Sequence, residues 1–427
     1  MHMRPQPCQT PIVPSEEAAS ERLWQRLQPE LWPLPLAALP AGSAIVGGAV
    51  RDGLLGRLQQ RPDLDIVVPQ GAVALCRRLA RQLGGSAVVL DQERDIARLV
   101  LREWTFDLAA WEGDSLEADL SRRDYSINAI ALPLQHGAPL LDPCGGRAAL
   151  ERRRLEAISE ANLRSDPLRL LRGLRLACEL DFALDAHTRA LIAALQPHLA
   201  EVASERVLAE LDKLACAPAG AAGLLQVERS GLLSPWVPAG TTLLSPLAGL
   251  DPERAESLGL SGDESSWALP LARMACLADA ATLARLRSSR ALQKRVQRLR
   301  DGLQLLGGRT PAALADDERF ALHRNLEADL PALLLLLPDG SDQKALLQRW
   351  RDAEDPLCHP RPPLDGERLQ ELLQRGPGPW LGQLLLQLSQ ARALGQLTPN
   401  ASETEVLNLA RCLAEAGLQH TPNRRRD

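Results

Sequence analysis

SAIVGGAVRDGLLG, residues 43–56, and the run DLDIVV that follows at 63–68 decide the fold of this chain. The first six residues are an apolar run that ends in two glycines, and a helical pattern begins directly after it. This order predicts a strand, a tight turn and a helix. DLDIVV alternates at its start between polar and apolar residues, which predicts a second strand. Together the two segments predict the beginning of an α/β sheet domain.

The flanking sequence extends this prediction toward the C-terminus. A helical stretch at 72–83 precedes three short runs rich in β-forming residues, at 86–90, 96–101 and 104–110. From about Glu151 the pattern changes to long helical periods that are interrupted by Pro/Gly clusters. We therefore predict an α+β protein, in which an N-terminal α/β domain is followed by an all-helical region.

The composition argues against several classes of protein. The 427 residues carry a formal net charge of −5, unlike a uniformly basic protein that coats nucleic acid. The eight cysteines include no C-x-x-C pair, so neither a zinc ribbon nor a disulfide framework is indicated. The N-terminus lacks an apolar signal region, and no segment approaches the roughly 18 apolar residues of a membrane span. We expect a cytoplasmic protein that does not bind membranes; the sequence does not fix its oligomeric state.

Two glycines and two aspartates are the first candidates for chemistry. Gly47 and Gly48 let backbone N–H groups approach a triphosphate without a Cβ in the way, and the following helix start favours anions. Residues i and i+2 of a strand share a face, so Asp63 and Asp65 place two carboxylates together, and carboxylates are ligands that Mg²⁺ prefers. Asp107, on a later strand, would add a third carboxylate from the same side. An isolated D-x-D is more simply an exposed strand with solvated charges, so the rest of the pattern decides.

Four further motifs follow along the chain: RRDYSINA (122–129), DPCGG (142–146), SDPLRLLRGLRLA (165–177) and ERVLAELDKL (205–214). With the glycine and aspartate motifs before them, they resemble in order and spacing the class II tRNA nucleotidyltransferase and bacterial poly(A) polymerase family. The resemblance runs from about residue 44 to 218. It implies a nucleotidyltransferase-type head with a mixed sheet, Mg²⁺ as cofactor, and tRNA, CTP and ATP as partners.

The resemblance also implies a division of the chain into domains. Residues 1–40 would be an N-terminal extension and 41–150 the catalytic head. Residues 151–217 would form a helical neck that selects the base, and 218–427 a helical body and tail that binds tRNA. The paired glycines of DPCGG would be a hinge between head and neck, although a plain turn explains them equally well.

Individual residues acquire roles from the same resemblance. Asp63, Asp65 and Asp107 would be catalytic, with Asp63 and Asp65 as the metal ligands of a two-metal reaction. We expect the R-R-D motif to open a helix and to bind phosphate and ribose, although capping of a helix by charge would explain the motif alone. The nucleotide-binding residues outside the base-selecting segment would be Gly47, Gly48, Arg51, Arg122, Arg123, Asp124 and Asn128.

Asp166 and Arg169 are three residues apart on a predicted helix and therefore on one face. A carboxylate acceptor beside a guanidinium donor matches the Watson–Crick edges of cytosine and adenine, whereas uracil and guanine present the reverse order of groups. The pair would thus select C and A and leave groups unpaired against U and G. Without the resemblance, an ordinary surface ion pair explains this spacing. Ser165 stands where the family commonly has Glu, and Arg172 would either hold the helix or meet phosphate.

A basic stretch, ARLRSSRALQKRVQRLR at 284–300, lies outside the resemblance. As a helix it would be basic over much of its surface, which suits the tRNA phosphate backbone as well as it suits a solvated face. The candidate RNA-binding residues are Arg285, Arg287, Arg290, Lys294, Arg295 and Arg298.

Four functions compete within this interpretation. The first is complete CCA addition, because the whole core motif set is present. The second is CC addition alone, with a separate enzyme adding the terminal A. It is favoured by the short segment between Asp107 and Arg123, which is often longer in relatives that add all three nucleotides. A poly(A) polymerase would carry an Arg-rich G-R-R-F-like stretch that this chain lacks, and an inactive tRNA-binding module has no need of paired metal carboxylates.

Overall fold

The computed structural model describes residues 16–340, 342–398 and 400–419. The chain divides into two compact units, Met1–Val202 and Ala203–Asp427, and each is described by itself. The first fifteen residues of the predicted extension and the last eight of the predicted tail lie outside the described residues. The predicted neck spans the division, because its final helix belongs to the second unit.

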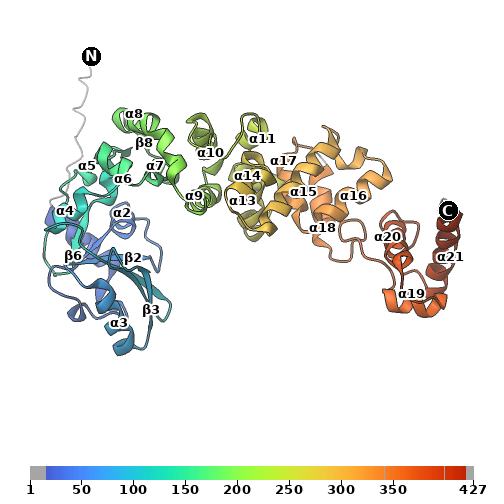
Figure 1. The fold of residues 1–427 in the computed structure, drawn as a ribbon, viewed down its shortest axis with the longest axis horizontal. Helices are drawn as coiled ribbons and strands as arrows, with labels where there is room; N and C mark the ends of the chain where they lie inside the picture. Colours follow the sequence, from blue (N-terminus) through green and yellow to red (C-terminus); the bar gives the residue numbers. More distant parts are fainter. Residues whose placement is uncertain (1–15, 341, 399, 420–427) are drawn as a thin grey trace, which may run out of the picture. The chain divides into compact units, whose positions relative to one another are not determined.

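The first unit combines one large sheet with short helices (Figure 1). Its strands are β1 (Ala44–Val46), β2 (Leu64–Val68), β3 (Ser86–Asp91), β4 (Ile96–Leu101), β5 (Trp104–Ala110), β6 (Ala131–Pro133), β7 (Arg154–Leu155) and β8 (Ala183–Leu184). Its α-helices are α1 (Glu16–Leu27), α2 (Gly48–Leu54), α3 (Ala72–Leu83), α4 (Leu116–Ser121), α5 (Gly146–Glu151), α6 (Glu160–Ser165), α7 (Leu168–Leu180) and α8 (Ala186–Leu195). The 3₁₀ turns are η1 (Pro29–Leu31), η2 (Leu36–Ala38), η3 (Ser126–Asn128) and η4 (Gln196–Glu201).

Six strands form the head sheet in the order β3-β4-β5-β2-β1-β6. β2 and β5 are parallel and the other neighbours are antiparallel, so the predicted mixed sheet is confirmed. All five strands expected from the sequence at 43–110 are present, as is the helix at 72–83. That helix, α3, packs against β3, β4 and β5 and covers one face of the sheet.

One polar position lies within the buried centre of the head sheet. β2 is buried at every position except Asp65, which is only half-buried. Around it, Val46, Val67 and Ala131 belong to a cluster of fully packed side chains that joins β1, β2 and β6. A polar side chain therefore stands in the middle of the sheet on an otherwise apolar strand, and its neighbours fix its position.

Residues before the predicted head belong to the first unit's core. On α1, Leu23 is 1% exposed, and Trp24 and Leu27 are also buried. A Cβ on Gly53 of α2 would lie 2.2 Å from Leu23 Cδ1, so glycine permits the two helices to approach closely. The part of the predicted extension that the structure describes thus packs on the head.

The region after the head is not helical throughout. β7 and β8 form a short parallel pair, with Arg154 opposite Ala183 and Leu155 opposite Leu184. The remaining elements of the second half are helices, as predicted.

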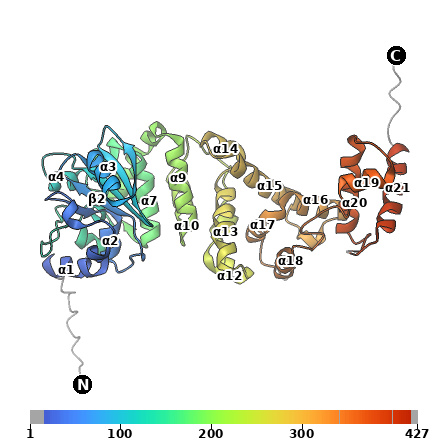
Figure 2. The same ribbon diagram turned by 90° about the horizontal axis from the view of Figure 1, so that it is seen from below.

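The second unit is helical throughout its described residues (Figure 2). Its α-helices are α9 (Ser204–Cys216), α10 (Gly220–Arg229), α11 (Leu244–Ala248), α12 (Pro252–Leu258), α13 (Gly262–Leu277), α14 (Ala280–Arg285), α15 (Arg290–Leu306), α16 (Asp316–Leu326), α17 (Leu330–Leu336), α18 (Asp342–Arg351), α19 (Gly366–Leu373), α20 (Pro379–Ala393) and α21 (Glu403–Gln419). Two 3₁₀ turns, η5 (Pro311–Ala313) and η6 (Glu327–Asp329), connect helices. Among the described residues of the whole chain, no helix has the length and apolar character needed to cross a bilayer.

Candidate active site

Three predicted site residues from different motifs meet at the end of β1. Gly47 joins β1 to α2 with a φ of 72°, a conformation that favours glycine. A Cβ on Gly47 would lie 2.9 Å from Asp65 Oδ2 and 3.9 Å from Arg123 Nη1. Any other residue would therefore displace the carboxylate of Asp65. The glycine turn, the D-x-D strand and the R-R-D segment form one site.

The carboxylates predicted as catalytic gather on neighbouring strands. Asp65 on β2 lies opposite Asp107 on the parallel strand β5, and Asp63 directly precedes β2. Burial raises the pKa of the Asp65 carboxyl above its usual range, and the charges of Asp107 and Asp63 add to this, whereas Arg123 and Arg172 act in the opposite direction. The raised pKa of Asp65 therefore reflects mainly its burial, with a smaller contribution from the neighbouring carboxylates.

Asp107 is held by Arg98, a residue that the sequence interpretation missed. The two lie opposite each other on β4 and β5, and Arg98 Nε and Nη2 donate to the two carboxylate oxygens at 2.7 and 2.9 Å. The signal was present in the sequence, because a hairpin with a two-residue turn at 102–103 aligns these two positions.

The residues present fit a hard divalent cation at Asp63 and Asp65 by the chemistry of their donors. Asp107 has both its oxygens bonded to Arg98. Within 16–340, 342–398 and 400–419, no three His, Cys, Asp or Glu side chains are grouped closely enough to hold a metal. The pair Asp63 and Asp65 is therefore the metal-binding arrangement that we retain as a proposal.

The R-R-D motif does not open a helix, and this prediction is wrong. α4 ends at Ser121, Arg122 is its C-cap, and the next turn, η3, begins only at Ser126. The Ser115 side chain accepts a hydrogen bond from the N–H of Ala118 and so starts the helix before the motif. The arginines consequently lie in the turn after a helix.

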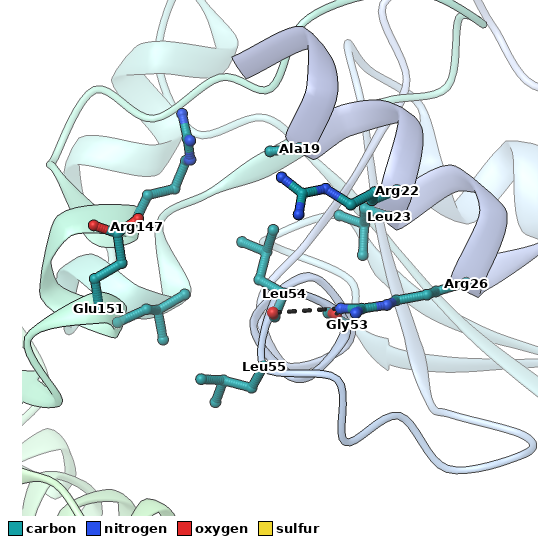
Figure 3. Close-up of a pocket in the computed structure, with 10 residues that line it drawn as sticks. Ala19, Arg22, Leu23, Arg26, Gly53, Leu54, Leu55, Arg147 and Glu151 are labelled. Carbon is teal, nitrogen blue, oxygen red and sulfur yellow. Dashed lines mark hydrogen bonds between the residues drawn. The ribbon is translucent and has the colours of Figure 1, made fainter. Parts of the chain in front are cut away.

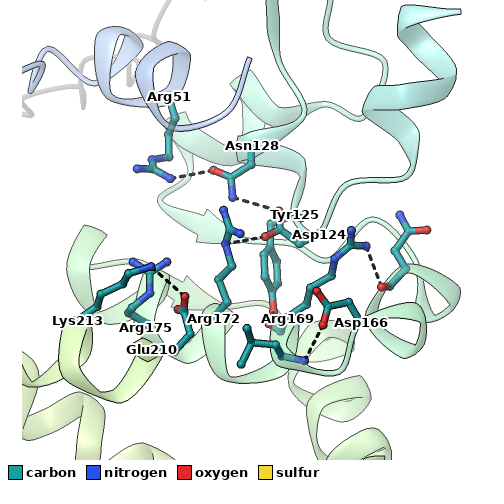
Figure 4. Close-up of polar contacts among 12 residues, drawn as sticks. Arg51, Asp124, Tyr125, Asn128, Asp166, Arg169, Arg172, Arg175, Glu210 and Lys213 are labelled. Atoms are coloured by element: carbon teal, nitrogen blue, oxygen red, sulfur yellow. Dashed lines mark hydrogen bonds and ion pairs between the residues drawn. The ribbon is translucent and has the colours of Figure 1, made fainter. Parts of the chain in front are cut away.

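Asp124 is the centre of a buried polar network (Figure 4). Its Oδ1 accepts hydrogen bonds from the Tyr125 backbone N at 2.8 Å and from Asn128 Nδ2 at 3.1 Å. Its Oδ2 pairs with Arg172 Nε at 3.0 Å. Burial raises the pKa of Asp124, but Arg172, the two N–H donors and Arg169 outweigh it, so the net pKa is lowered and the carboxylate is charged.

The network continues from Asn128 to Arg51 on α2. Arg51 Nη1 donates to Asn128 Oδ1 at 2.8 Å, and its Nε and Nη2 donate to Asp52. Arg51, Asp124, Asn128 and Arg172, which were predicted separately as nucleotide-binding residues, are therefore connected through direct contacts.

The two arginines of the motif differ in their surroundings. Arg123 is held by Asp119, with Nη2 2.9 Å from Oδ2, and is 25% exposed. Arg122 pairs with Glu112 at 3.1 Å and is 62% exposed. Arg123 is thus the arginine that the fold fixes beside Gly47 and Asp65, and Arg122 lies at the surface.

Asp166 and Arg169 lie at the junction of α6 and α7. Asp166 is the C-cap of α6 in an extended conformation, so the prediction that both residues share one helix is wrong. Pro167 interrupts the helical pattern between them, because proline disfavours the helical conformation of the residue before it. The backbone N of Arg169 donates to Asp166 O at 3.0 Å, which keeps the two residues adjacent despite the break.

Arg169 also connects this junction to the R-R-D turn. Its Nη1 donates to the carbonyl oxygens of Arg122 at 3.0 Å and Asn162 at 2.9 Å. Asn162, which the sequence interpretation missed, donates from Nδ2 to the carbonyl oxygens of Ser121 and Arg123, each at 2.8 Å. The segment predicted to select the base and the segment predicted to bind phosphate are therefore fixed to each other.

Tyr125 and Gly173 complete that connection. The Tyr125 hydroxyl donates to Arg169 O at 2.7 Å, and a Cβ on Gly173 would meet this hydroxyl oxygen at a distance far inside contact. Burial raises the pKa of Tyr125, so it stays a neutral donor. A glycine inside an otherwise strong helical pattern was the available signal for such a close approach.

The basic stretch in the second unit is not one helix. It divides into α14 and α15, with Arg287 in the turn between them at a φ of 56°. Arg285 donates to Trp236 O, Arg287 pairs with Glu205, and Arg295 pairs with Asp329. Arg290, Lys294 and Arg298 recur every four residues on α15, are exposed, and have no side-chain partner in the described part of the chain. The RNA-contact prediction remains a prediction, and these three residues are the ones available for it.

A separate cavity of about 200 Å³ lies between α1, α2 and α5 (Figure 3). Arg26 Nη1 donates to Gly53 O at 2.5 Å across its floor, and Arg22 Nε donates to Ala18 O at 3.2 Å. Arg26 thus joins α1 to α2, whereas the Arg22 bond stays within α1, and none of the predicted site residues lines this cavity.

Comparisons with known proteins identify the family of the chain. Residues 43–156 match the family model for the poly A polymerase head domain, and residues 181–244 match the model for a probable RNA and SrmB-binding site of polymerase A. The CC-adding tRNA nucleotidyltransferase of Synechocystis sp. is 34% identical over 407 residues, which covers 90% of this chain and 96% of the relative. The A-adding tRNA nucleotidyltransferase of Deinococcus radiodurans is 32% identical, covering 87% of this chain and 96% of the relative.

Solved structures show the same fold. The crystal structure of the Bacillus stearothermophilus CCA-adding enzyme in complex with CTP superimposes with a TM-score of 0.68. The alignment covers 96% of this chain and 100% of that one at 21% sequence identity. At this identity the likeness concerns the fold alone.

Proposed function

This chain belongs to the class II tRNA nucleotidyltransferase and poly(A) polymerase family, and on that premise we propose that it is a CC-adding enzyme. It transfers two cytidylate residues from CTP to a tRNA that lacks its CCA end and leaves the terminal adenylate to a separate enzyme. From the sequence alone, complete CCA addition was the first choice. The near full-length similarity to a CC-adding relative supports the alternative better.

The observation that carries this proposal is the short, tightly held segment between Asp107 and Arg123. It consists of the end of β5, a brief loop and α4. Two hydrogen bonds fix its loop. Trp111 N donates to Val68 O at 2.9 Å, and Glu112 N donates to Asp119 Oδ1 at 3.1 Å. A segment held in this way resists the rearrangement that accommodating a second, larger base would require.

Base selection is assigned to Asp166 and Arg169. Cytosine presents an amino donor beside a ring-nitrogen acceptor, which a carboxylate and a guanidinium complement. Arg169 is oriented by the Arg122 and Asn162 carbonyl oxygens, so its position does not depend on the incoming nucleotide. Uracil would leave these donors and acceptors unpaired once the bound nucleotide excludes water from them, at a cost of about 1–3 kcal/mol for each group.

The triphosphate and the sugar are assigned to the head. Gly47 and Gly48 offer open backbone, and Arg123 supplies positive charge beside them. Asn128 and Asp124, bonded to each other, are assigned to the ribose side of the nucleotide, which they would meet by exchanging present partners for the sugar hydroxyls. Asp63 and Asp65 would hold Mg²⁺, which when bound supplies charge neutralisation for phosphoryl transfer.

The test is extension of tRNA transcripts that end before CCA or after CC, with Mg²⁺, CTP and ATP, resolved at single-nucleotide length. We expect the first transcript to gain two cytidylates and stop, and the second to remain unchanged. Extension of both to CCA would identify a complete CCA-adding enzyme, and extension of only the second would identify an A-adding enzyme. An Asp65→Ala protein serves as the inactive control.

Two competing functions give different results in the same assay. A poly(A) polymerase would extend unrelated RNA with ATP alone. An inactive tRNA-binding module would extend nothing, and its tRNA affinity would be unaffected by Asp63→Ala.

A further inference from the structure

A cavity in the second unit contains no residue of the predicted site. It measures about 590 Å³ and lies among α16, α17, α18 and the C-terminal end of α20. Its rim includes the exposed residues Gly308, Thr310 and Gly340, so the cavity is open to solvent. Cavities of roughly 300–1,000 Å³ commonly hold small organic ligands.

His323 on α16 lines this cavity and has no polar partner in the described part of the chain. It is 1% exposed, and neither ring nitrogen has a hydrogen-bond partner among the described residues. Burial lowers the pKa of His323 to about 4, and the charges of Arg349 and Arg319 contribute in the same direction, so the imidazole is neutral at pH 7. A neutral imidazole carries one donor and one acceptor, and folded proteins rarely leave both unsatisfied.

Three guanidinium groups surround the same space. Arg309, Arg319 and Arg349 line the cavity, and each is oriented by a carboxylate: Glu318, Asp316 and Asp355. Arg319 Nε is a further buried donor without a partner among the described residues. Oriented guanidinium groups are suited to phosphate, because they present paired N–H donors.

Besides the three carboxylates paired with these arginines, two acidic side chains line the cavity itself. Asp339 and Asp342 are the carboxylates that line it, and both lie at the exposed edge. Asp339 is paired with Arg254. The side chains of Arg309 and Arg349 are 44% and 50% exposed and that of Arg319 is 30% exposed, so the guanidinium groups lie toward the open side of the cavity and His323 lies deeper.

Part of the cavity lining is apolar. Leu334, Leu337, Leu346 and Leu357 form this part, with Leu394 following α20. A leucine surface of this kind buries a flat ring, and His323 provides a donor and an acceptor for the ring's polar edge.

From this combination we propose that the cavity is a second small-molecule site that binds a nucleoside monophosphate. The phosphate lies within the arginine group, and the base packs on the leucine wall with its polar edge at His323. The site is distinct from the nucleotidyl transfer site of the head, and the proposal does not depend on the reaction assigned there. Ordered water alone in the cavity is the competing explanation of the unpartnered histidine.

Hydrogen–deuterium exchange on the full chain tests the proposal, because it reports the location of binding as well as its strength. AMP is the probe, without Mg²⁺, CTP or tRNA. At AMP ten times above its Kd, we expect roughly tenfold slower exchange for locally opening amides in 308–326 and 342–350. Adenosine and inorganic phosphate, tested separately, are expected to give much weaker protection.

Two variants and one matched control complete the experiment. His323→Leu and Arg319→Met should each abolish the protection at 308–326. Arg324→Met, which changes an exposed arginine on the same helix, should preserve it. The proposal is overturned if AMP protects only the first unit, if both variants keep the protection, or if phosphate alone equals AMP. Absence of protection by any of the three probes would leave water as the occupant and would also overturn it.

Discussion

Asp124 in the first unit and His323 in the second are both buried titratable side chains, yet their surroundings are opposite. Asp124 has a partner for each oxygen, from Tyr125, Asn128 and Arg172. His323 has none among the described residues, although it is equally inaccessible. The pKa of each group is lowered, but the causes differ: partners stabilise the charge of Asp124, whereas burial disfavours the charge of His323.

Asp124 and His323 represent two kinds of buried polar side chain, one fully hydrogen-bonded within the described chain and one without partners there. A fully bonded group positions its neighbours, as Asp124 does for Asn128 and Arg172. A buried group without partners in the described chain is bonded either by water or by a ligand, and His323 poses that choice. Asp65 combines both situations, since Arg123 is nearby but burial and two carboxylates still raise its pKa.

The largest effect is expected at Asp65. Asp65→Asn removes a carboxylate that the reaction needs and should reduce nucleotide incorporation by about 10³-fold or more. Because the change also removes an unfavourably buried charge, the melting temperature should stay unchanged or rise. Steady-state incorporation and thermal unfolding measure the two effects. Asp114→Asn, at an exposed position of the same unit, is the control. If Asp65→Asn lowered the melting temperature together with nucleotide incorporation, Asp65 would have a structural role.

Asp124→Ala tests whether a fully bonded group stabilises the fold. It leaves Arg172 and the Asn128 amide without their partner, so we expect a loss of about 3–5 kcal/mol in the free energy of unfolding. Urea denaturation provides the measurement, with Asp114→Ala as control. A loss below about 1 kcal/mol would show that the network positions substrate without supporting the fold.

His323→Leu should raise the free energy of unfolding, whereas Asp124→Ala lowers it. The size of the increase should depend on pH. The pKa of His323 is about 4 when folded and near 6.5 when unfolded, so the unfolded state binds more protons between these values. The wild-type protein therefore loses stability as the pH falls from about 6.5 to 4, by about 2–3 kcal/mol at pH 4.5. The variant lacks this loss.

Urea denaturation at pH 7.5 and pH 4.5 measures the difference. The stability advantage of His323→Leu should increase toward the lower pH, whereas an exposed His187→Leu change should leave both values unaltered. Equal pH dependence of the wild type and His323→Leu would contradict the buried neutral state.

The smallest effect is expected at Arg169. Its side chain is held by the carbonyl oxygens of Arg122 and Asn162 and is proposed to contact the incoming base. Arg169→Ala should relax the preference for CTP over UTP by roughly 10–100-fold, corresponding to about 1–3 kcal/mol. Competition between the two nucleotides on one tRNA measures the ratio, with Arg164→Ala on α6 as control. A uniform loss with an unchanged ratio would assign Arg169 only to the connection with the R-R-D turn.

Local patterns predicted most of the head correctly. The strands at 43–110 and α3 have periodicities that agree with their final environments, so nearest-neighbour preferences and burial point the same way. The R-R-D helix start was wrong because the Ser115 cap lies upstream and the helix ends before Arg123. The prediction of one basic helix was wrong because residues 286–289, which hold one arginine and two serines, form a turn in which Arg287 takes a positive φ.

Contacts between distant segments explain what the sequence interpretation missed. Arg98, Asn162 and Tyr125 act on residues 9, 39 and 44 positions away, respectively. No local spacing rule encodes the last two pairings. His323 gave no signal either, because a single histidine in a helix has the same pattern whether it is exposed, bonded or left without partners.

The sequence by itself determined the α+β class, the strand order along the chain and the identity of the paired carboxylates and glycines, because these depend on short-range periodicity and on motifs with fixed spacing. Only the tertiary structure decided that Gly47, Asp65 and Arg123 meet, that Asp107 is bonded to Arg98, and that a buried histidine borders an open cavity. Each of these findings depends on which side chains are brought together when distant segments pack. It also depends on which side-chain donors and acceptors find no partner after the backbone hydrogen bonds have formed.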